Sequence, residues 1–302
     1  MKKILVLMMS LCLMLVLAGC GSDSKPAADK DAKTITVGFS VSTQNNPFFV
    51  SLKDGVEAKA KEMGVKVVTL AAQDDPAKQA NDISDLIQQK VDVLLINPVD
   101  SEAIATSVEA ANKAGIPVIA LDRSSDGGKV ASLVASDNVA GGEMAAKYII
   151  EKLGEGINVV EIEGIPGASA TRERGEGFHK LADSKLHVVA KQNADFDRTK
   201  GLTVAENILQ ANDNVQAIFA HNDEMALGAI EAAKSAGKNI FIVGFDGTDD
   251  GVNAVKVEGT MAATIAQQPK LMGEQGLEAA VKAAKGEKVA EKISVPLQLV
   301  TK

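Results

Sequence analysis

The sequence ITVGFSVSTQNNPFF, residues 35–49, joins an alternating apolar run to a turn rich in polar and aromatic residues. The alternation predicts a β-strand over 35–41, and the apolar spacing after the turn predicts a helix. One face of that helix should carry Phe49, Leu52, Val56 and Met63, whereas Phe48 is turned about 100° away. The chain has no Trp, one Tyr and eight Phe, so two adjacent rings here predict a binding loop. The alternative is that both rings belong to the core.

Beyond this turn, apolar β-branched runs alternate with Ala-rich segments that carry charged faces. Strands are expected at 35–41, 65–70, 93–96, 118–121, 130–134, 159–162, 215–219 and 240–244, with helices at 76–90, 101–114, 141–152 and 223–236. Such alternation predicts a parallel sheet with helices on both faces. Because 302 residues exceed the usual size of a single domain, the expected fold class is α/β with two doubly wound parallel-sheet lobes.

Side chains with several hydrogen-bonding atoms follow six of the expected strands. These strand ends carry Ser42 with Asn46, then Asn97, Asp122 with Arg123, Asn138, Asn222, and Phe245 with Asp246. Open parallel sheets bind ligands outside the carboxyl ends of their strands. Each residue alone is weak evidence, because Asn and Asp are common in turns and helix caps. Together they predict a site that grips neighbouring hydroxyl groups.

Motifs for catalysis, cofactors and metals are incomplete. His179, His187 and His221 have no carboxylate or thiol partner at ligand spacing, so neither a metal site nor a catalytic triad is expected. His221 either lines the cleft or packs as a neighbour of Asn222. Glycine patterns for a nucleophile elbow or a dinucleotide loop lack members. The chain is therefore predicted not to be an enzyme and to need no cofactor.

An apolar run at 4–17 follows Lys2 and Lys3 and ends in LAGC, residues 17–20. The run is short for a membrane span and precedes small residues, which predicts an export signal over 1–19. Resemblance to bacterial lipoproteins implies that Cys20 becomes the lipidated first residue; the alternative is a plain secretory signal. Residues 20–33 have no apolar period and predict a flexible tether. Without the signal the chain keeps 30 basic and 40 acidic residues, so no nucleic-acid partner is expected.

With these motifs the chain resembles the bacterial ribose-binding proteins, the periplasmic-type solute receptors of sugar ABC importers. The resemblance covers nearly the whole chain from Thr34. It rests on STQNNPFF at 42–49, LLINP at 94–98, LDR at 121–123, ASDN at 135–138, RERGEGF at 172–178, ADFDR at 194–198, NDEMALG at 222–228, VGFDGT at 243–248 and ATIAQ at 263–267.

The resemblance implies a set of sugar-binding residues. Phe48, Phe49 and Phe196 would contact the apolar faces of a pyranose, with Phe245 a further candidate. The hydroxyls would be bonded by Asn46, Asp122, Arg123, Arg174, Asn222, Asp246 and Gln267, and Ser42, Asn97 and Asn138 complete the candidates. The alternative for Arg174, in the charged run 172–174, is a solvated helix face.

The family's architecture and partners carry over as expectations. The resemblance implies the type I periplasmic binding protein fold, with one lobe at 34–136 plus 268–296 and another at 137–267 plus 297–302. Crossing segments near 136–138, 266–268 and 295–298 would form a three-segment hinge. The implied protein is a monomer that captures D-ribose, delivers it to an ABC permease, and is held by lipid at the outer face of the cell membrane, or on the periplasmic side in a host with two membranes.

Two other functions are alternatives to this interpretation. A sugar-responsive transcription repressor shares the lobe architecture by resemblance, but it should carry a basic helix-turn-helix where this chain has an export signal. A receptor of the same fold for another monosaccharide or a furanose signal, feeding import or chemotaxis, is the stronger alternative. Sugar identity depends on contacts that a sequence does not measure.

Overall fold

The computed structural model describes residues 34–302, so the predictions for the signal peptide, Cys20 and the tether lie outside the described residues. Two six-stranded sheets organise this part of the chain, and each anchors one lobe. Both lobes belong to one compact unit, Thr34–Lys302. Within it, no helix has the length and apolar character needed to cross a membrane.

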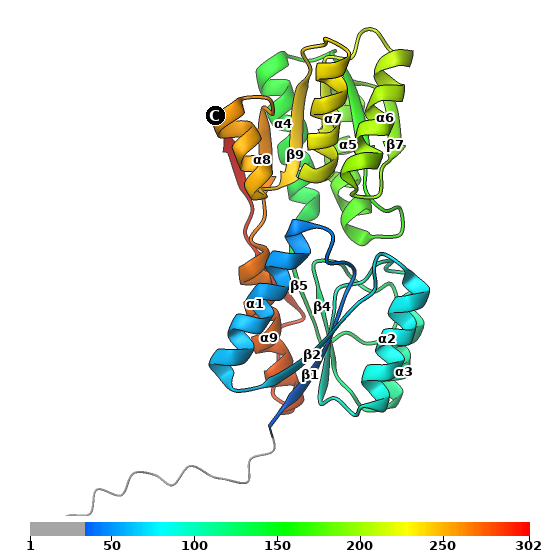
Figure 1. Ribbon diagram of the computed structural model, residues 1–302, viewed down its shortest axis with the longest axis vertical. Coiled ribbons are helices and arrows are strands. Elements are labelled where there is room, and N and C mark those ends of the chain that lie inside the picture. The colour runs from blue at the N-terminus through cyan, green and yellow to red at the C-terminus, as the bar shows by residue number, and fades with distance from the viewer. Residues whose placement is uncertain (1–33) are drawn as a thin grey trace, which may run out of the picture. The chain divides into compact units, whose positions relative to one another are not determined.

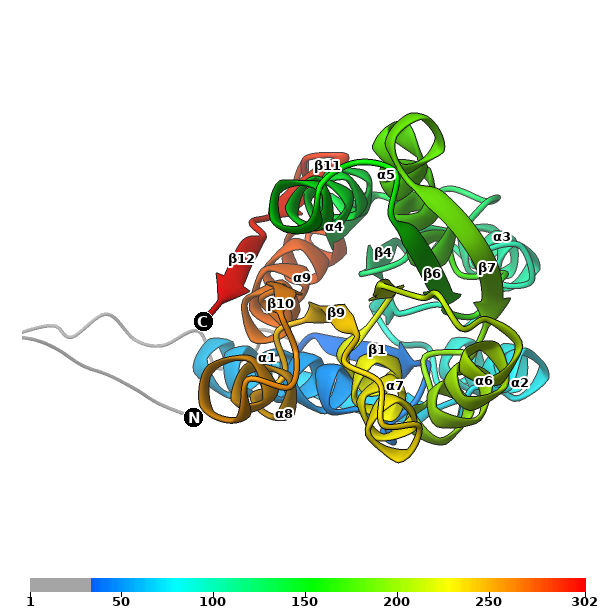
Figure 2. The same ribbon diagram turned by 90° about the horizontal axis from the view of Figure 1, so that it is seen from above.

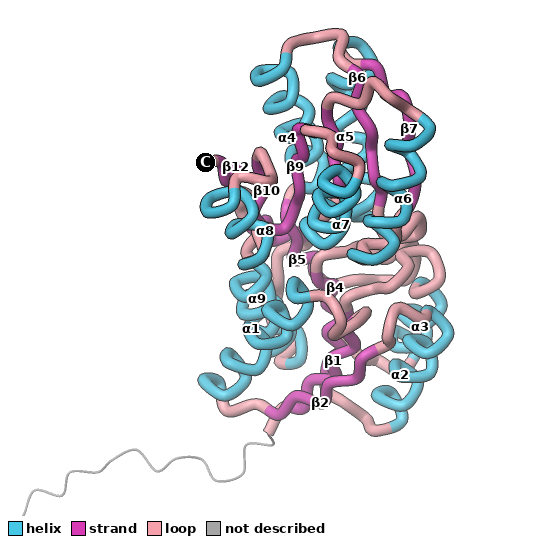
Figure 3. The backbone as a smooth tube through the Cα atoms, turned by 45° about the horizontal axis from the view of Figure 1, so that its top comes forward, coloured by secondary structure: helices cyan, strands magenta, loops and turns pink. Residues whose placement is uncertain are grey.

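The first sheet has the spatial order β2-β1-β3-β4-β5-β11, and all its pairs are parallel. Its strands are β1 (Thr36–Val41), β2 (Lys66–Ala71), β3 (Val93–Ile96), β4 (Val118–Leu121), β5 (Ser132–Ser136) and β11 (Lys292–Val295). Helices α1 (Pro47–Met63) and α9 (Pro269–Ala284) cover one face, and α2 (Pro76–Gln88) and α3 (Ala105–Lys113) cover the other (Figure 3). The fully apolar strands β3 and β4 are buried because helices shield both faces.

The second sheet repeats this order as β7-β6-β8-β9-β10-β12. Its strands are β6 (Asn158–Glu163), β7 (His187–Asn193), β8 (Ala217–Ala220), β9 (Phe241–Asp246), β10 (Ala263–Ala266) and β12 (Gln298–Thr301). Helices α4 (Asn138–Leu153) and α5 (Ser169–Lys185) lie on one face, and α6 (Arg198–Ala211) and α7 (Asp223–Ser235) on the other (Figure 2). A short α8 (Asp249–Asn253) runs into a π-helical turn, Ala254–Glu258. The prediction of two doubly wound lobes is confirmed.

The chain passes between the two sheets three times. β5 of the first sheet leads into α4, β10 of the second leads into α9, and β11 and β12 are separated by Pro296 and Leu297. α9 thereby returns to the first lobe and lies beside α1, far from it in sequence (Figure 1). The residue boundaries proposed for the lobes stay a prediction.

Some elements differ from those expected. Strands β7, β10, β11 and β12 were not predicted, and β12 pairs antiparallel with β10. A parallel return needs a long crossover; here two residues carry the chain from the carboxyl edge of one sheet to that of the other, so β12 runs in reverse. Met63 is 38% exposed, because α1 ends at this residue, beyond the part of the helix that packs on the sheet.

Several polar residues that follow strands also begin the next helix. The Asn46 side chain accepts from the Phe48 amide at 2.9 Å, and Pro47 occupies the first turn of α1. Asp137 caps α4 and Asn222 caps α7 in the same way. The strand-to-helix turns are therefore held locally, which places their side chains at the carboxyl edges of both sheets.

Candidate functional site

A small cavity lies between the carboxyl edges of the two sheets. The first lobe contributes five of its lining residues: Asn46, Phe48, Phe49, Asp122 and Arg123. The second lobe and the segment that follows β10 contribute the others: Ala170, Arg174, Phe196, Asn222, Asp246 and Gln267. Ten of the fourteen residues predicted for the site thus meet around one space.

Arg123 reaches the cavity from the loop after β4. Its Nη1 donates to the carbonyl oxygens of Pro98 and Val99, at 2.9 and 3.4 Å. Its guanidinium lies 5.0 Å from the ring centre of Phe49 and 5.2 Å from that of Phe196, which belongs to the other lobe. Backbone acceptors and aromatic faces therefore hold this buried cation from both sides.

Arg174 reaches the same cavity from the second turn of α5. Its Nε donates to Asn138 Oδ1 at 2.9 Å, and its Nη1 donates to the His221 carbonyl at 2.5 Å. Its guanidinium lies 3.8 Å from the ring centre of Phe245. Only 3% of the side chain is exposed, so the alternative that Arg174 lies on a solvated helix face is wrong.

Each arginine has a carboxyl neighbour. Asp122 Oδ2 lies 3.5 Å from Arg123 Nε, and Asp246 Oδ1 lies 3.7 Å from Arg174 Nη1. Burial raises the pKa of Asp122, and it raises that of Asp246 to about 8 although Arg174 opposes the rise. The Asp246 carboxyl accepts a hydrogen bond from Gln267 Nε2 at 2.9 Å. This bond lowers the pKa by less than the loss of hydration raises it.

Three buried polar atoms of the cavity wall have no hydrogen-bond partner among the described residues. They are Asp122 Oδ1, Arg123 Nε and Gln267 Oε1. Buried polar atoms are normally paired, and an unpaired one costs free energy. A donor and two acceptors that converge on one space are arranged to be completed by a ligand that both donates and accepts, as a hydroxyl does.

Three residues of the wall have unusual backbone conformations. Phe196 has φ 62°, Asp122 φ 65° and Asp246 φ 113°. Such values are strained for residues other than glycine and gather at functional sites. The Phe196 ring packs against Gly164, where a Cβ would have no room. Phe48 and Phe49 pack edge to face with ring centres 5.1 Å apart, so both rings are buried and both also face the cavity.

Four predicted site residues do not line the cavity but stand behind it. Asn97 accepts from the Ser42 amide at 3.2 Å and donates to the Leu121 carbonyl at 3.1 Å, which ties together the strand ends that carry the first-lobe wall. Asn138 and Phe245 hold the Arg174 guanidinium as described above. The sequence shows that these residues lie at strand ends, but not how deep they lie. Ala170 lines the wall and was missed, because its small apolar side chain carries no chemical signal.

Two of the three histidines, His179 and His221, have a carboxylate partner that their spacing in the sequence does not reveal. Buried Glu161 bonds His221 Nε2 at 2.9 Å and His179 Nε2 at 2.8 Å. Glu161 and His221 are 60 positions apart and meet because β6 and β8 are adjacent. Together with Glu163 they offer three potential metal-ligand atoms within 4.8 Å of one another, but the Glu161 oxygens are already used by the two rings. His221 does not line the cavity; it lies behind Arg174.

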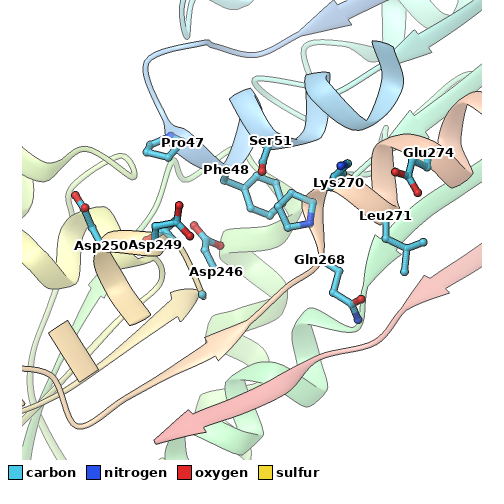
Figure 4. Close-up of a pocket in the computed structure, with 13 residues that line it drawn as sticks. Pro47, Phe48, Ser51, Asp246, Asp249, Asp250, Gln268, Lys270, Leu271 and Glu274 are labelled. Atoms are coloured by element: carbon cyan, nitrogen blue, oxygen red, sulfur yellow. The ribbon is translucent and has the colours of Figure 1, made fainter. Parts of the chain in front are cut away.

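A second, larger hollow of about 680 Å³ adjoins the cavity. Figure 4 shows its walls, formed by the start of α1, the residues after β9 and the start of α9. Phe48 and Asp246 line both spaces. They therefore lie between the inner cavity and this outer hollow, whose lining also includes Asp249, Asp250 and Glu274.

The chain is similar to known proteins both in sequence and in structure. Residues 37–288 match the model of the periplasmic binding protein domain. The ribose import binding protein RbsB of Bacillus subtilis is 56% identical over all of this chain and 99% of its own length. RbsB of Haemophilus influenzae is 56% identical over 88% of this chain and 91% of its own. An ABC transporter solute binding protein from Bacillus halodurans, solved with bound myo-inositol, is similar with a TM-score of 0.85 and 31% identity, covering 90% of this chain and 96% of that one.

Proposed function

The chain belongs to the periplasmic binding protein family, and we propose that it captures D-ribose between its two lobes and delivers it to an ABC permease. It acts by binding and release and performs no chemistry on the sugar. The full-length similarity to the ribose import binding proteins supports this choice of ligand and of partner.

One structural observation carries the proposal: polar atoms without a hydrogen-bond partner among the described residues converge on a single buried space. Asp122 Oδ1 and Arg123 Nε come from the first lobe, and Gln267 Oε1 from the segment that follows β10. Two guanidinium groups and two carboxyl groups line this one space, so its wall offers both hydrogen-bond donors and acceptors. Such a wall suits a neutral ligand whose hydroxyls donate to carboxylates and accept from guanidinium groups. The rings of Phe48, Phe49 and Phe196 supply apolar faces for the C–H surfaces of a sugar.

Calorimetric titration of the purified chain with a panel of sugars tests the ligand. We expect D-ribose to bind at one site per chain and more tightly than D-allose, L-arabinose or myo-inositol. Heat from another sugar together with none from ribose would overturn the choice of ribose. Release of a converted sugar after incubation would overturn the claim that the protein only binds.

A different polyol is the second candidate ligand. The Bacillus halodurans relative was solved with myo-inositol, and the unpaired atoms named above do not by themselves distinguish a pentose from a cyclitol. The same titration decides between them, because the ranking of ribose and myo-inositol is its direct readout.

The three passages between the sheets are proposed to act as a hinge. Arg123 and Arg174 lie on different lobes, so only closed lobes allow both to bond the same sugar, and ligand should shift the population towards closure. Small-angle scattering with and without ribose measures this, and an unchanged radius of gyration at saturation would contradict it.

Attachment to the outer face of the cell membrane through lipid on Cys20 is also proposed, from the LAGC sequence alone. One acyl chain anchors weakly, so more than one is expected. Detergent partitioning of the wild-type protein and of Cys20→Ala tests the anchor. A wild-type protein found wholly in the aqueous phase would disprove it.

A further inference from the structure

Direct contacts join the lobes beside the cavity, and they use residues outside its wall. Ser101 follows β3 in the first lobe, and its amide donates to the Gly167 carbonyl of the second lobe at 2.9 Å. The Ser169 amide donates to Ser101 Oγ at 3.1 Å, and the Ser124 amide donates to Ser169 Oγ at 2.9 Å. Three hydrogen bonds therefore cross between the lobes, and three serines take part in them.

One of these bonds completes the helix that carries Arg174. α5 begins after Ala168, whose side chain offers no cap. The first amides of a helix have no partner within the helix, and here the amide of Ser169 is satisfied by Ser101 Oγ from the other lobe. Ser101 thus acts as a helix cap across the interface. When the lobes separate, α5 loses this acceptor.

The serine contacts are buried, whereas an ion pair at their rim is not. Ser101 is fully buried and Ser169 is 3% exposed. The Arg172 guanidinium bonds Asp126 at 2.8 and 3.0 Å, but both side chains are about 40% exposed, where ion pairs contribute little. The free energy of this contact therefore comes mainly from the serines.

We propose that Ser101, Ser124 and Ser169 form an inter-lobe latch that holds the closed lobes in register and strengthens the binding of every sugar the cavity accepts by the same factor. The three serines are positioning residues and touch no sugar. This inference rests on the proposed function, because it concerns the affinity of the same cavity. Part of the affinity then comes from the contact between the lobes and does not depend on the ligand's hydroxyl pattern.

The test compares Ser101→Ala and Ser169→Ala with a buried serine outside the latch. Each change removes one acceptor, and a net hydrogen bond of ordinary strength corresponds to about a fivefold change in affinity. We expect Ser101→Ala to weaken D-ribose and D-allose by the same factor, with the sugar ranking and the ligand-free melting temperature unchanged. Ser132→Ala is the matched control, since Ser132 is buried on β5 and its hydroxyl has no partner among the described residues.

Gly167→Ala attacks the latch from the opposite lobe without removing a hydrogen-bonding group. A methyl group there meets the Asp100 carboxyl of the first lobe, which is itself held by bonds from the Glu102 and Ala103 amides. The clash exists only when the lobes are closed. We expect weaker binding of both sugars, again by one common factor, with a normal ligand-free melting temperature.

Three outcomes would overturn the latch: affinity unchanged in all three variants, loss confined to one sugar, or a ligand-free melting temperature that falls in Ser101→Ala but not in Ser132→Ala. The last would mean that the serine supports its own lobe. If ribose fails to bind the wild-type chain while another sugar binds, the proposed ligand is wrong. The latch is then tested with the sugar that binds.

Discussion

Arg123 and Arg174 reach one cavity from different lobes, and they are held in different ways. Arg123 is fixed by the backbone carbonyls of Pro98 and Val99, which no side-chain substitution removes. Arg174 is fixed by the Asn138 side chain and the Phe245 ring, besides the His221 carbonyl. The first arginine therefore depends on the path of a loop, and the second depends on side chains packed behind it.

Removing either arginine should have the largest effect. Hydrogen bonds to charged groups contribute about 1.5–3 kcal/mol, so Arg123→Ala and Arg174→Ala should each weaken ribose binding roughly tenfold to a hundredfold. Both should also change the ranking among epimeric sugars. A guanidinium group held in one orientation donates only to hydroxyls that point in a matching direction, and epimers differ in that direction. Calorimetry with ribose and its epimers measures both effects.

Phe196→Ala is the matched comparison for the arginines. Loss of an apolar face costs about 1–3 kcal/mol, which is similar in size, but a ring face is alike among pyranoses. The Phe196 variant should therefore lose affinity for all sugars equally. An Arg174→Ala chain that binds ribose within about twofold of wild type would remove Arg174 from the site.

Asn138→Ala should affect Arg174 without affecting Arg123. It removes the acceptor of Arg174 Nε and leaves Arg123 and its carbonyl partners in place. One neutral hydrogen bond contributes about 1 kcal/mol net, so we expect affinity to fall about fivefold, with the altered epimer ranking of Arg174→Ala in weaker form. An Asn138→Ala chain with the uniform loss expected of Phe196→Ala would show that Asn138 does not position the guanidinium.

The last prediction concerns stability and not affinity: a pH dependence that comes from the Arg174 side of the cavity. Burial raises the pKa of Asp246 from 3.8 to about 8. Between these values the folded chain keeps a proton that the unfolded chain has released, so this group makes stability fall as pH rises, until the fall ends above about pH 8. Asp246→Asn should flatten that slope.

Melting temperatures of the ligand-free chain at pH 6, 7 and 8 provide the measurement. Burial raises the pKa of Asp223 to about 6, so its contribution is nearly complete below this window. The surface variant Asp54→Asn should keep the wild-type slope, since Asp54 is exposed. Equal slopes in wild type and Asp246→Asn would show that Asp246 titrates normally in the folded chain.

Most of the site residues that could be predicted without the resemblance lie at the ends of strands. Asn46, Asp122, Arg123 and Asn222 each follow a strand and Asp246 ends one, so position along the chain was enough to place them at the carboxyl edges of the sheets. The structure brings all five to the cavity wall. Arg174, Phe196 and Gln267 were placed by resemblance, and the structure brings them to the same wall. Whether each contacts a sugar stays a prediction.

The sequence by itself determined the repeating strand and helix pattern, because hydrophobic periodicity and helix caps act over a few neighbouring residues. Only the tertiary structure decided which polar residues face the cavity and which stand behind it, as Asn138 and Phe245 do. It also decided that Glu161 meets two histidines, that β12 runs antiparallel, and that Ser101 caps a helix in the other lobe. These contacts join positions up to 68 apart in sequence. Contacts between such distant residues, and the burial of a side chain behind the cavity wall, arise only when the sheets and lobes assemble.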